Sequence, residues 1–357
     1  MGIEPFALER WFDEHEHDAD LMLAESGIRS LPASRFDLDP GELGYVIPTD
    51  GDPDFRADIG ERYGRSADEV VLTVGAQEAN FLLFASQLDP GDHAVVVTPT
   101  YQALQSVPEA FGEVTEVPLS PPDWRLDVDA VADAIRPETT LLVLANPNNP
   151  TGRYHPLETV EALNDLAVDA GAYLHCDEVY RLLADDPLPP VASIGDRGVS
   201  TTSLTKSFGL AGLRLGWLCG PRTVVEGVTR WKDYTTISPS VFGQHVARQA
   251  LDDSVDILSE NRTLARQNRA RVAAFLTEHN LVWFEPVGVN GFVRLPDGFD
   301  GSREFCRQVV EEQSVVLAPG DCFGYDDFFR IGFGLPTDEL EDGLSRLGSF
   351  LDRNRAG

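Results

Sequence analysis

Short apolar runs separated by helical stretches dominate the first two thirds of the chain. Five runs have the pattern of buried strands, at residues 70–74, 94–98, 141–145, 172–176 and 215–219, and residues 127–135 and 156–170 have the apolar spacing of helices. Strands that are apolar on both faces and alternate with helices are typical of a mostly parallel sheet sandwiched by helices. The pattern predicts an α/β fold, in which ligands bind beyond the carboxyl ends of the strands.

The pattern changes near residue 240. Residues 242–251 and 258–279 predict two long helices, and a smaller sheet follows from apolar runs at 282–284, 291–295, 315–318 and 329–333, with helices at 302–313 and 338–353. A chain of 357 residues is also long enough for two domains. We expect an N-terminal arm (1–44) that contributes to the small domain, a large domain (45–250) and a small α/β domain (251–357).

The charge of the chain is strongly negative. It has 28 basic and 59 acidic residues, a net charge of −31, and 34 of the acidic residues are aspartate. An acidic, lysine-poor surface keeps a protein hydrated in concentrated salt, where the Debye length falls to roughly 3 Å at 1 M. We therefore predict a salt-adapted cytoplasmic protein, as in an extreme halophile, and no nucleic-acid or membrane partner. A secretory signal is not expected either.

The cysteines and a His-x-His segment could in principle form disulfides or bind a metal. The cysteines, at 176, 219, 306 and 322, are far apart and form no Cys-x-x-Cys pair, which predicts reduced and mostly buried thiols. His15-Glu16-His17 lies in an acidic, irregular segment and does not predict a metal site.

Lysine is nearly absent, and one of the two lysines lies in a stretch rich in reactive groups. Lys206 is part of Ser203-Leu204-Thr205-Lys206, and Arg214 follows eight residues later; the other lysine is Lys232. An amine is a usable nucleophile at neutral pH whereas a guanidinium is not, so retention of Lys206 suggests Schiff-base chemistry. Hydroxyls and an arginine beside an amine also suit a dianion.

Polar motifs follow three of the predicted strands. Asn146-Pro147-Asn148-Asn149-Pro150-Thr151-Gly152, Asp177-Glu178-Val179-Tyr180 and Gly75-Ala76-Gln77 come directly after residues 145, 176 and 74. A carboxylate that ends a buried strand needs a partner, such as a cationic ring nitrogen. A glycine between strand and helix aims backbone N–H groups at an anion. Taken singly, each motif also fits a structural role: a tight turn, a loop-bonded carboxylate, or a strand–helix turn.

Together these motifs resemble the class I/II aminotransferases, the fold-type-I family that uses pyridoxal 5′-phosphate (PLP). The resemblance covers about residues 25–346 and rests on Asn-Pro-x-Asn-Pro-Thr-Gly, Asp-Glu-x-Tyr and Ser-x-x-Lys-x-x-Gly-x-x-Gly-x-Arg in this order. It implies a large PLP-binding domain with a mostly parallel sheet and a smaller α/β domain. It also implies amino acid and 2-oxo acid substrates.

The resemblance assigns roles to the residues around the PLP ring. Lys206 resembles the lysine that binds the cofactor as a Schiff base and later moves a proton on the substrate. Asp177 resembles the carboxylate that keeps the pyridine nitrogen protonated, which makes the ring an electron sink. Asn149 and Tyr180 resemble the pair that hydrogen-bonds the phenolate oxygen of the ring. Tyr101 resembles the aromatic residue that stacks on the ring, although alone it could be a tyrosine of a surface turn.

The same resemblance assigns the phosphate and substrate contacts. The phosphate cup corresponds to Ser203, Thr205 and Arg214 with the backbone of Gly75, Ala76 and Gln77. Arg330 resembles the arginine that grips the substrate α-carboxylate in a bidentate manner, and Asn149 and Gly27 are further expected substrate contacts. Tyr45 resembles the tyrosine that reaches the phosphate of a neighbouring subunit, which implies a homodimer.

The resemblance implies an aminotransferase with ping-pong kinetics, but it leaves other reactions open. Elimination, decarboxylation or cyclisation of an arginine-derived intermediate would use the same cofactor-binding residues. A non-catalytic PLP-binding regulator would need an attached DNA-binding module, which we do not expect here. Dicarboxylate-specific relatives have a second cationic residue for the substrate side chain; here only Arg29 and Arg35 are candidates, by location alone.

Overall fold

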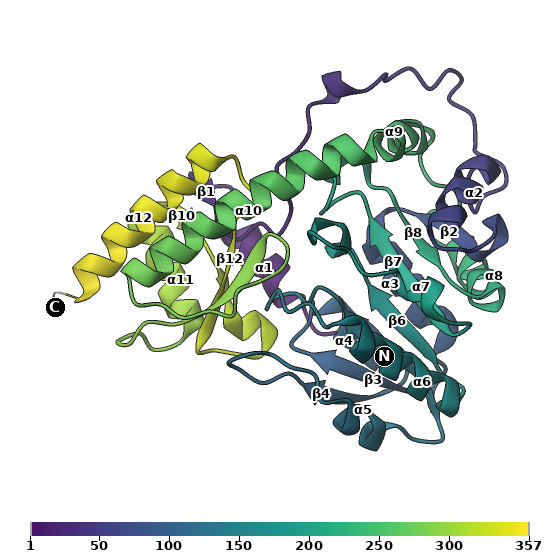
Figure 1. The fold of residues 1–357 in the computed structure, drawn as a ribbon, viewed down its shortest axis with the longest axis horizontal. Coiled ribbons are helices and arrows are strands. Elements are labelled where there is room, and N and C mark those ends of the chain that lie inside the picture. Colours follow the sequence, from purple (N-terminus) through teal and green to yellow (C-terminus); the bar gives the residue numbers. More distant parts are fainter. Residues whose placement is uncertain (1, 356–357) are drawn as a thin grey trace.

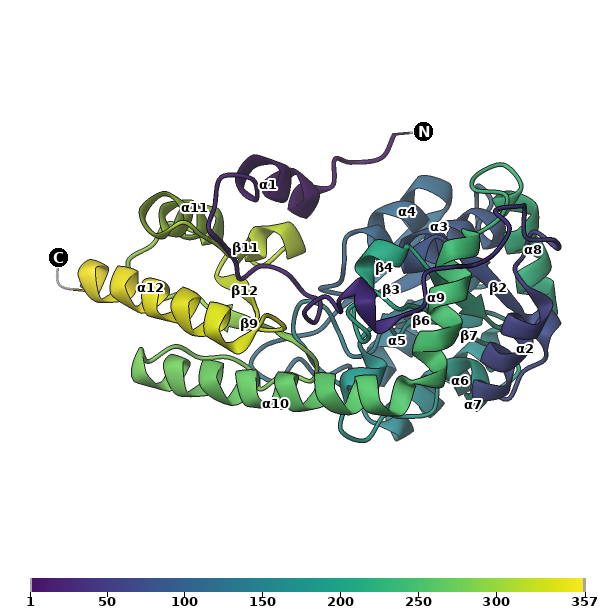
Figure 2. The same ribbon diagram turned by 90° about the horizontal axis from the view of Figure 1, so that it is seen from above.

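The computed structural model describes residues 2–355 and has two lobes (Figures 1 and 2). The large lobe contains a seven-stranded sheet with helices on both faces. The small lobe contains short strands covered by α11 (Ser302–Gln313) and α12 (Thr337–Arg355). A long helix, α10 (Ser254–Glu278), runs from the large lobe along the small one. Within residues 2–355, no helix is both long and apolar enough to span a membrane.

The large sheet has the order β2-β8-β7-β6-β5-β3-β4. Its strands are β2 (Val70–Thr73), β3 (His93–Thr98), β4 (Glu113–Pro118), β5 (Thr139–Ala145), β6 (Tyr173–Asp177), β7 (Gly198–Ser203) and β8 (Gly216–Cys219). All neighbouring pairs are parallel except β2–β8 and β7–β8. The predicted mostly parallel α/β sheet is thus confirmed, although the sequence pattern indicated only five of the seven strands and missed β4 and β7.

The helices begin and end where the sequence supplies suitable residues. In the large lobe they are α2 (Pro53–Arg62), α3 (Gly75–Gln87), α4 (Ala103–Phe111), α5 (Val128–Ala134), α6 (Leu157–Ala170), α7 (Val191–Ile194), α8 (Arg222–Lys232) and α9 (Val241–Asp252). The Asp52 side chain accepts a hydrogen bond from the Phe55 N–H, and Pro53 opens the helix where no intrahelical donor is needed. Gly171 ends α6 in the left-handed conformation, with φ 71°.

The small lobe departs from its prediction at one strand. An antiparallel sheet joins β11 (Ala318–Pro319), β12 (Phe328–Gly332) and β9 (Asn290–Arg294), and β10 (Val315–Val316) pairs with β1 (Leu21–Met22). The strand expected at 282–284 is wrong, because only Trp283 makes a single bridge there, to Val293. The four cysteines are free and buried, as predicted.

The N-terminal arm joins the two lobes. Helix α1 (Ala7–His15) packs against the small lobe near β11 (Figure 2). The following segment accepts a hydrogen bond at Leu23 O from Gly332 in the small lobe, and its Ile28 N–H donates to Lys206 O in the large lobe. The arm therefore positions its own side chains at the junction of the lobes, where the strand ends of the large sheet lie.

The second lysine has a structural place. Lys232 is 1% exposed at the end of α8. Its ammonium group donates to the carbonyl oxygens of Thr49 and Ile237. Lys232 thereby holds the chain that follows Tyr45 against the loop after α8.

Candidate active site

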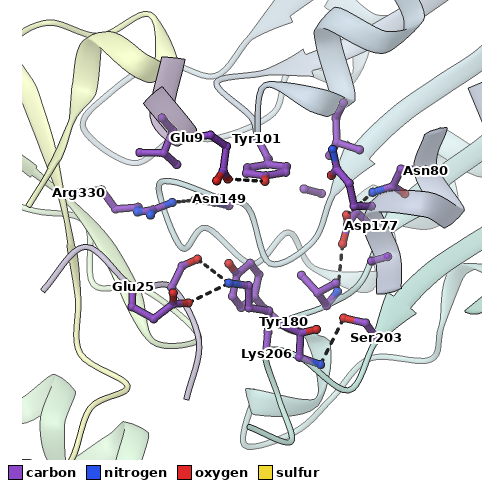
Figure 3. A pocket seen from close by; sticks show the side chains of 18 of the residues that line it. Glu9, Glu25, Asn80, Tyr101, Asn149, Asp177, Tyr180, Ser203, Lys206 and Arg330 are labelled. Atoms are coloured by element: carbon purple, nitrogen blue, oxygen red, sulfur yellow. Dashed lines mark hydrogen bonds and ion pairs between the residues drawn. The ribbon is translucent and has the colours of Figure 1, made fainter. Parts of the chain in front are cut away.

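A cavity of about 320 Å³ lies where the arm and both lobes meet (Figure 3). The large lobe contributes the carboxyl ends of β5, β6 and β7 and the start of α3. The arm contributes α1 and the residues at 25–26, and the small lobe contributes Arg330 on β12. The structure thus brings the separate polar motifs of the sequence to one place.

Lys206 extends into this cavity directly after β7. Its Nζ donates to Glu25 Oε1 at 3.0 Å and to Ser26 Oγ at 3.1 Å. Burial lowers the pKa of Lys206, but the charge of Glu25, the interaction with Tyr180 and the hydrogen bond to Glu25 together outweigh burial, so the pKa lies above its usual value. In this state Lys206 is therefore an ammonium ion paired with Glu25, and it has to lose a proton before it can react with a carbonyl compound.

Asp177 ends β6 and is 8% exposed. Its oxygens accept hydrogen bonds from Asn80 Nδ2 at 2.8 Å and from the Val179 N–H at 3.2 Å. Burial raises its pKa and outweighs these hydrogen bonds and the charge of Lys206, and no cation among the described residues forms an ion pair with it. A protonated ring nitrogen would supply the missing positive partner.

A buried network supports Asp177 from behind. Asn80, on α3, accepts from Thr201 Oγ1 at 2.6 Å and lies 3.1 Å from His175 Nε2. His175 is fully buried, and burial lowers its pKa to about 3, so the ring is neutral at physiological pH. The Asn80 amide is therefore oriented by two polar neighbours, with its NH₂ group toward the carboxylate.

The start of α3 forms one end of the cavity. The first N–H groups of a helix have no intrahelical acceptor and face outward, toward any anion bound there. Gly75 has φ +80°, and a Cβ there would lie 2.9 Å from Arg214 Nη2. Glycine thus permits both the turn and the close approach of the guanidinium. Ser203 and Thr205 line the cavity beside Arg214.

The middle of the cavity presents side chains suited to an aromatic ring. Tyr101, Asn149 and Tyr180 all line it. Tyr101 packs against Phe6 with ring centroids 4.9 Å apart, and its hydroxyl donates to Glu9 Oε1 at 3.2 Å. Burial, followed by the charge of Glu9, raises the pKa of Tyr101, so the phenol stays protonated. Among residues 2–355, Asn149 Nδ2 has no acceptor, which leaves this donor for a ligand.

Arg330 closes the side of the cavity formed by the small lobe. It is 1% exposed, and it donates from Nη1 to Asn149 Oδ1 at 2.9 Å and from Nη2 to Ala24 O at 2.7 Å. Its Nε is buried and has no hydrogen-bond partner among the described residues. A buried guanidinium with an unused donor fits an anion that enters the cavity, such as a carboxylate.

Most residues that the sequence singled out surround this cavity, and three do not line it directly. Tyr45 is 82% exposed and lies outside the cavity. Gly75 contributes through the turn that accommodates Arg214. Gly27 lies beside the Lys206 side chain, but its neighbours Glu25 and Ser26 form the wall.

Among the polar residues of the site that sequence reasoning missed are Glu9, Glu25, Asn80 and His175. The period of two in a strand could have indicated His175, because it shares a face with Asp177 two residues later. The other three come from α1, the arm and α3. Their approach to the cavity depends on tertiary packing and leaves no local signal.

The residues present fit PLP. The anion cradle at α3, the buried carboxylate of Asp177 and the amine of Lys206 match the phosphate, ring nitrogen and aldehyde of this cofactor. The unused Nε of Arg330 provides for a substrate carboxylate beside it. These observations define a class of protein, a PLP-dependent enzyme that acts on amino acids.

The chain belongs to the aminotransferase class I and II family, which it matches over residues 22–347, and PLP is the cofactor of this family. It is 32% identical over 381 residues to a capreomycidine synthase of Streptomyces vinaceus, with 100% of this chain and 97% of that protein covered. It is 30% identical over 336 residues to an aspartate/prephenate aminotransferase of Thermus thermophilus, with 90% and 86% covered.

Solved structures agree with this assignment. A PLP-dependent aminotransferase from Streptococcus suis superposes with a TM-score of 0.94 at 31% identity, over 99% of both chains. The PLP-dependent cyclase OrfR gives 0.89 at 28% identity, over 99% of this chain and 98% of that one. Aspartate aminotransferase from Thermus thermophilus also gives 0.89, at 27% identity over 97% of both chains. The fold is therefore that of the fold-type-I PLP enzymes.

Proposed function

We propose that this chain is an aminotransferase that moves an amino group from an amino acid to a 2-oxo acid. The observation that carries the proposal is the arrangement of Lys206, Asp177, Asn149 and Arg330 around one cavity. PLP supplies an aldehyde that captures the substrate amine and a ring that withdraws electrons from the substrate α-carbon. The protein has to hold the ring charge, orient the substrate and move protons.

Each of these tasks has a residue suited to it. Asp177 would hold the proton on the ring nitrogen, and Asn149 and Tyr180 would donate to the ring oxygen. Arg330 would grip the α-carboxylate, because its guanidinium is buried and fixed by Asn149 and Ala24. Lys206, once displaced from the cofactor, would carry the proton from the substrate α-carbon as a general base.

A homodimer with shared sites is part of the proposal. Exposed apolar side chains gather on the arm and beyond α8, at Leu43, Tyr45, Ile47 and Tyr234, with exposures of 68%, 82%, 81% and 89%. The two segments touch, because Ser238 Oγ donates to Val46 O at 3.2 Å. Large exposed apolar patches indicate protein–protein contact. This surface supports a partner subunit whose Tyr45 completes the phosphate site.

A second reaction on the same scaffold, a cyclisation or elimination, is favoured by two of the similar proteins, the capreomycidine synthase and the cyclase OrfR. An aminotransferase leaves the cofactor as pyridoxamine phosphate until an oxo acid arrives. A cyclase or lyase restores the original absorption after each turnover. The end state of the cofactor therefore separates the two functions.

The test is the visible absorption of the purified protein in high potassium chloride, with and without single amino acids. We expect the band of the lysine-bound cofactor, its conversion to pyridoxamine phosphate by a donor amino acid, and its return with a 2-oxo acid. Lys206→Ala is expected to abolish the band, whereas Lys232→Arg keeps it. A band that survives in Lys206→Ala would overturn the assignment, and a band that recovers without an oxo acid would favour the second reaction.

A further inference from the structure

Three glutamates line the cavity on the side formed by the arm. Glu9 lies on α1, Glu16 directly follows this helix, and Glu25 lies on the segment that crosses to Lys206. Figure 3 shows Glu9 and Glu25 on either side of the contact between Arg330 and Asn149. All three come from the N-terminal 25 residues, which also close the site between the lobes.

The proposed function uses every other charged side chain that lines the cavity. The basic lining residues are Lys206, Arg214 and Arg330, and the fourth acidic one is Asp177. With PLP and an amino acid bound, Arg214 would hold the phosphate, Arg330 the α-carboxylate and Asp177 the ring nitrogen. Lys206 binds the cofactor and no longer neutralises Glu25. The negative charge of the three glutamates is then left without a cation in the cavity.

The glutamates also have oxygens left to accept hydrogen bonds. Tyr101 donates to Glu9 Oε1, and Glu9 Oε2 has no hydrogen-bond partner among the described residues. The pKa of Glu25 is lowered chiefly by the charge of Lys206, and further by the charge of Arg330 and a backbone hydrogen bond from Gly27, which remain when Lys206 binds the cofactor. Both side chains thus present negative oxygens toward the space beside Arg330.

The two arginines that were candidates for a side-chain carboxylate are occupied elsewhere. Arg35 forms ion pairs with Asp253 at 2.9 Å and with Glu260 at 2.8 Å. Arg29 donates to Asn261 Oδ1 at 3.2 Å, and neither arginine lines the cavity. Within residues 2–355 of one subunit, a substrate with an acidic side chain would therefore meet carboxylates and no further cation in the cavity.

We propose that the site takes an amino acid whose side chain is a cation, a guanidinium or an ammonium group, and that Glu9 and Glu25 bind this group. The proposal rests on the proposed function, because Arg330 must hold the α-carboxylate for the side chain to face the glutamates. A charge-assisted hydrogen bond changes affinity by about tenfold to a hundredfold, and a buried like charge opposes binding. Cationic amino acids should thus be preferred over neutral ones of equal length.

The experiment titrates the PLP-loaded dimer or monomer, whichever is purified, with matched amino acids and follows the visible band. L-Arginine is compared with L-citrulline, and L-lysine with L-2-aminoheptanoate, because the members of each pair have side chains of equal length and differ mainly in charge. We expect at least tenfold tighter apparent binding for the cationic member of one pair or both. L-Glutamate is expected not to bind. The pair that shows the difference identifies guanidinium or ammonium.

Substitutions test whether the glutamates are responsible. Glu9→Gln keeps an acceptor for Tyr101. It is expected to weaken binding of the cationic amino acid about tenfold, while the affinity for the neutral member of the pair changes less than twofold. Glu25→Gln should act in the same direction, and Glu14→Gln, on the same helix but outside the cavity, should have no effect.

The outcomes separate the two proposals. Equal binding of charged and neutral members, or conversion by L-glutamate but not by a cationic amino acid, would overturn the substrate class and leave the cofactor chemistry intact. Unchanged discrimination in both Gln variants would overturn the role of the glutamates. Absence of any PLP band would overturn the proposed function itself, together with the inference that depends on it.

Discussion

The hydrogen bond from Asn80 to Asp177 gives the sharpest test of how the protein holds the cofactor ring. Asn80 is 2% exposed, and its amide contacts Asp177, Thr201 and His175. Asn80→Ala removes a donor to a buried carboxylate, which is worth about 1.5–3 kcal/mol when the acceptor is charged. The pKa of Asp177, already raised by burial, is expected to rise further, so the carboxylate holds the ring nitrogen less firmly.

The expected result is a weaker complex with the cofactor. The lost bond corresponds to about tenfold to a hundredfold in the dissociation constant. Pyridoxamine phosphate is the better probe, because it cannot bond covalently to Lys206 and therefore reports the non-covalent contacts alone. Quenching of tryptophan fluorescence in the apoprotein, measured at falling pH from pH 8, should show a deficit in affinity that grows in the acid direction, because the variant carboxyl group takes up a proton more readily.

A matched control separates this effect from general damage to the fold. Asn164 is also buried, at 7% exposed, but it lies on α6 away from the cavity. Asn164→Ala should leave the affinity for pyridoxamine phosphate unchanged, whatever its effect on the unfolding temperature. If Asn80→Ala binds this ligand within twofold of the unchanged protein at every pH, Asn80 has only a structural role and the reasoning fails.

Two other substitutions give defined expectations. Gly75→Val places a Cβ against Arg214 at a φ of +80°, so PLP should bind at least tenfold more weakly, while pyridoxal, which lacks the phosphate, should bind as before. Gly64→Ala, at a φ of +65° with no neighbour within 4 Å, controls for backbone strain. Equal losses of affinity for PLP and pyridoxal in Gly75→Val would contradict the phosphate role. His175 has a folded pKa of about 3 against a usual 6.5, so the unfolded chain takes up the proton first and stability falls as the pH drops through this interval. Urea denaturation between pH 7 and pH 4 should show that His175→Gln removes about 1.4 kcal/mol per pH unit of this fall, and an unchanged slope would show that His175 is already charged.

The sequence predicted those strands whose residues are apolar on both faces. The two missed strands are polar for different reasons. In β4 only Val117 is buried and both glutamates, Glu113 and Glu116, are exposed, as suits an edge strand. In β7 every residue is buried, but its hydroxyls are bonded internally, for example Ser200 Oγ to Glu178 Oε1 and Thr201 Oγ1 to Asn80 Oδ1. A hydrophobic pattern cannot detect a buried strand whose polar groups are satisfied by tertiary partners.

Some residues of the candidate site could likewise be predicted from the sequence and others could not. Motifs that directly follow predicted strands, such as those at Asn149 and Asp177, could be predicted, because the ends of parallel strands meet at one edge of the sheet. Lys206 was indicated by the scarcity of lysine, because the strand before it, β7, was missed. Glu9 and Glu25 could not, because they reach the cavity through packing of the arm across both lobes. Salt adaptation, cytoplasmic location and the dimer stay predictions from composition, from the absence of targeting patterns and from resemblance.

Because lysine is scarce, chemical labelling of amines can report whether Lys206 carries the cofactor. Lys232 is 1% exposed and donates to two carbonyl oxygens, whereas the Lys206 side chain is 23% exposed and faces the cavity. Apart from the α-amino group, an acylating reagent therefore meets one accessible amine, and only while no cofactor is attached to it. The mass added to the intact folded protein would count vacant sites directly, and borohydride reduction would mark the occupied ones at the same residue.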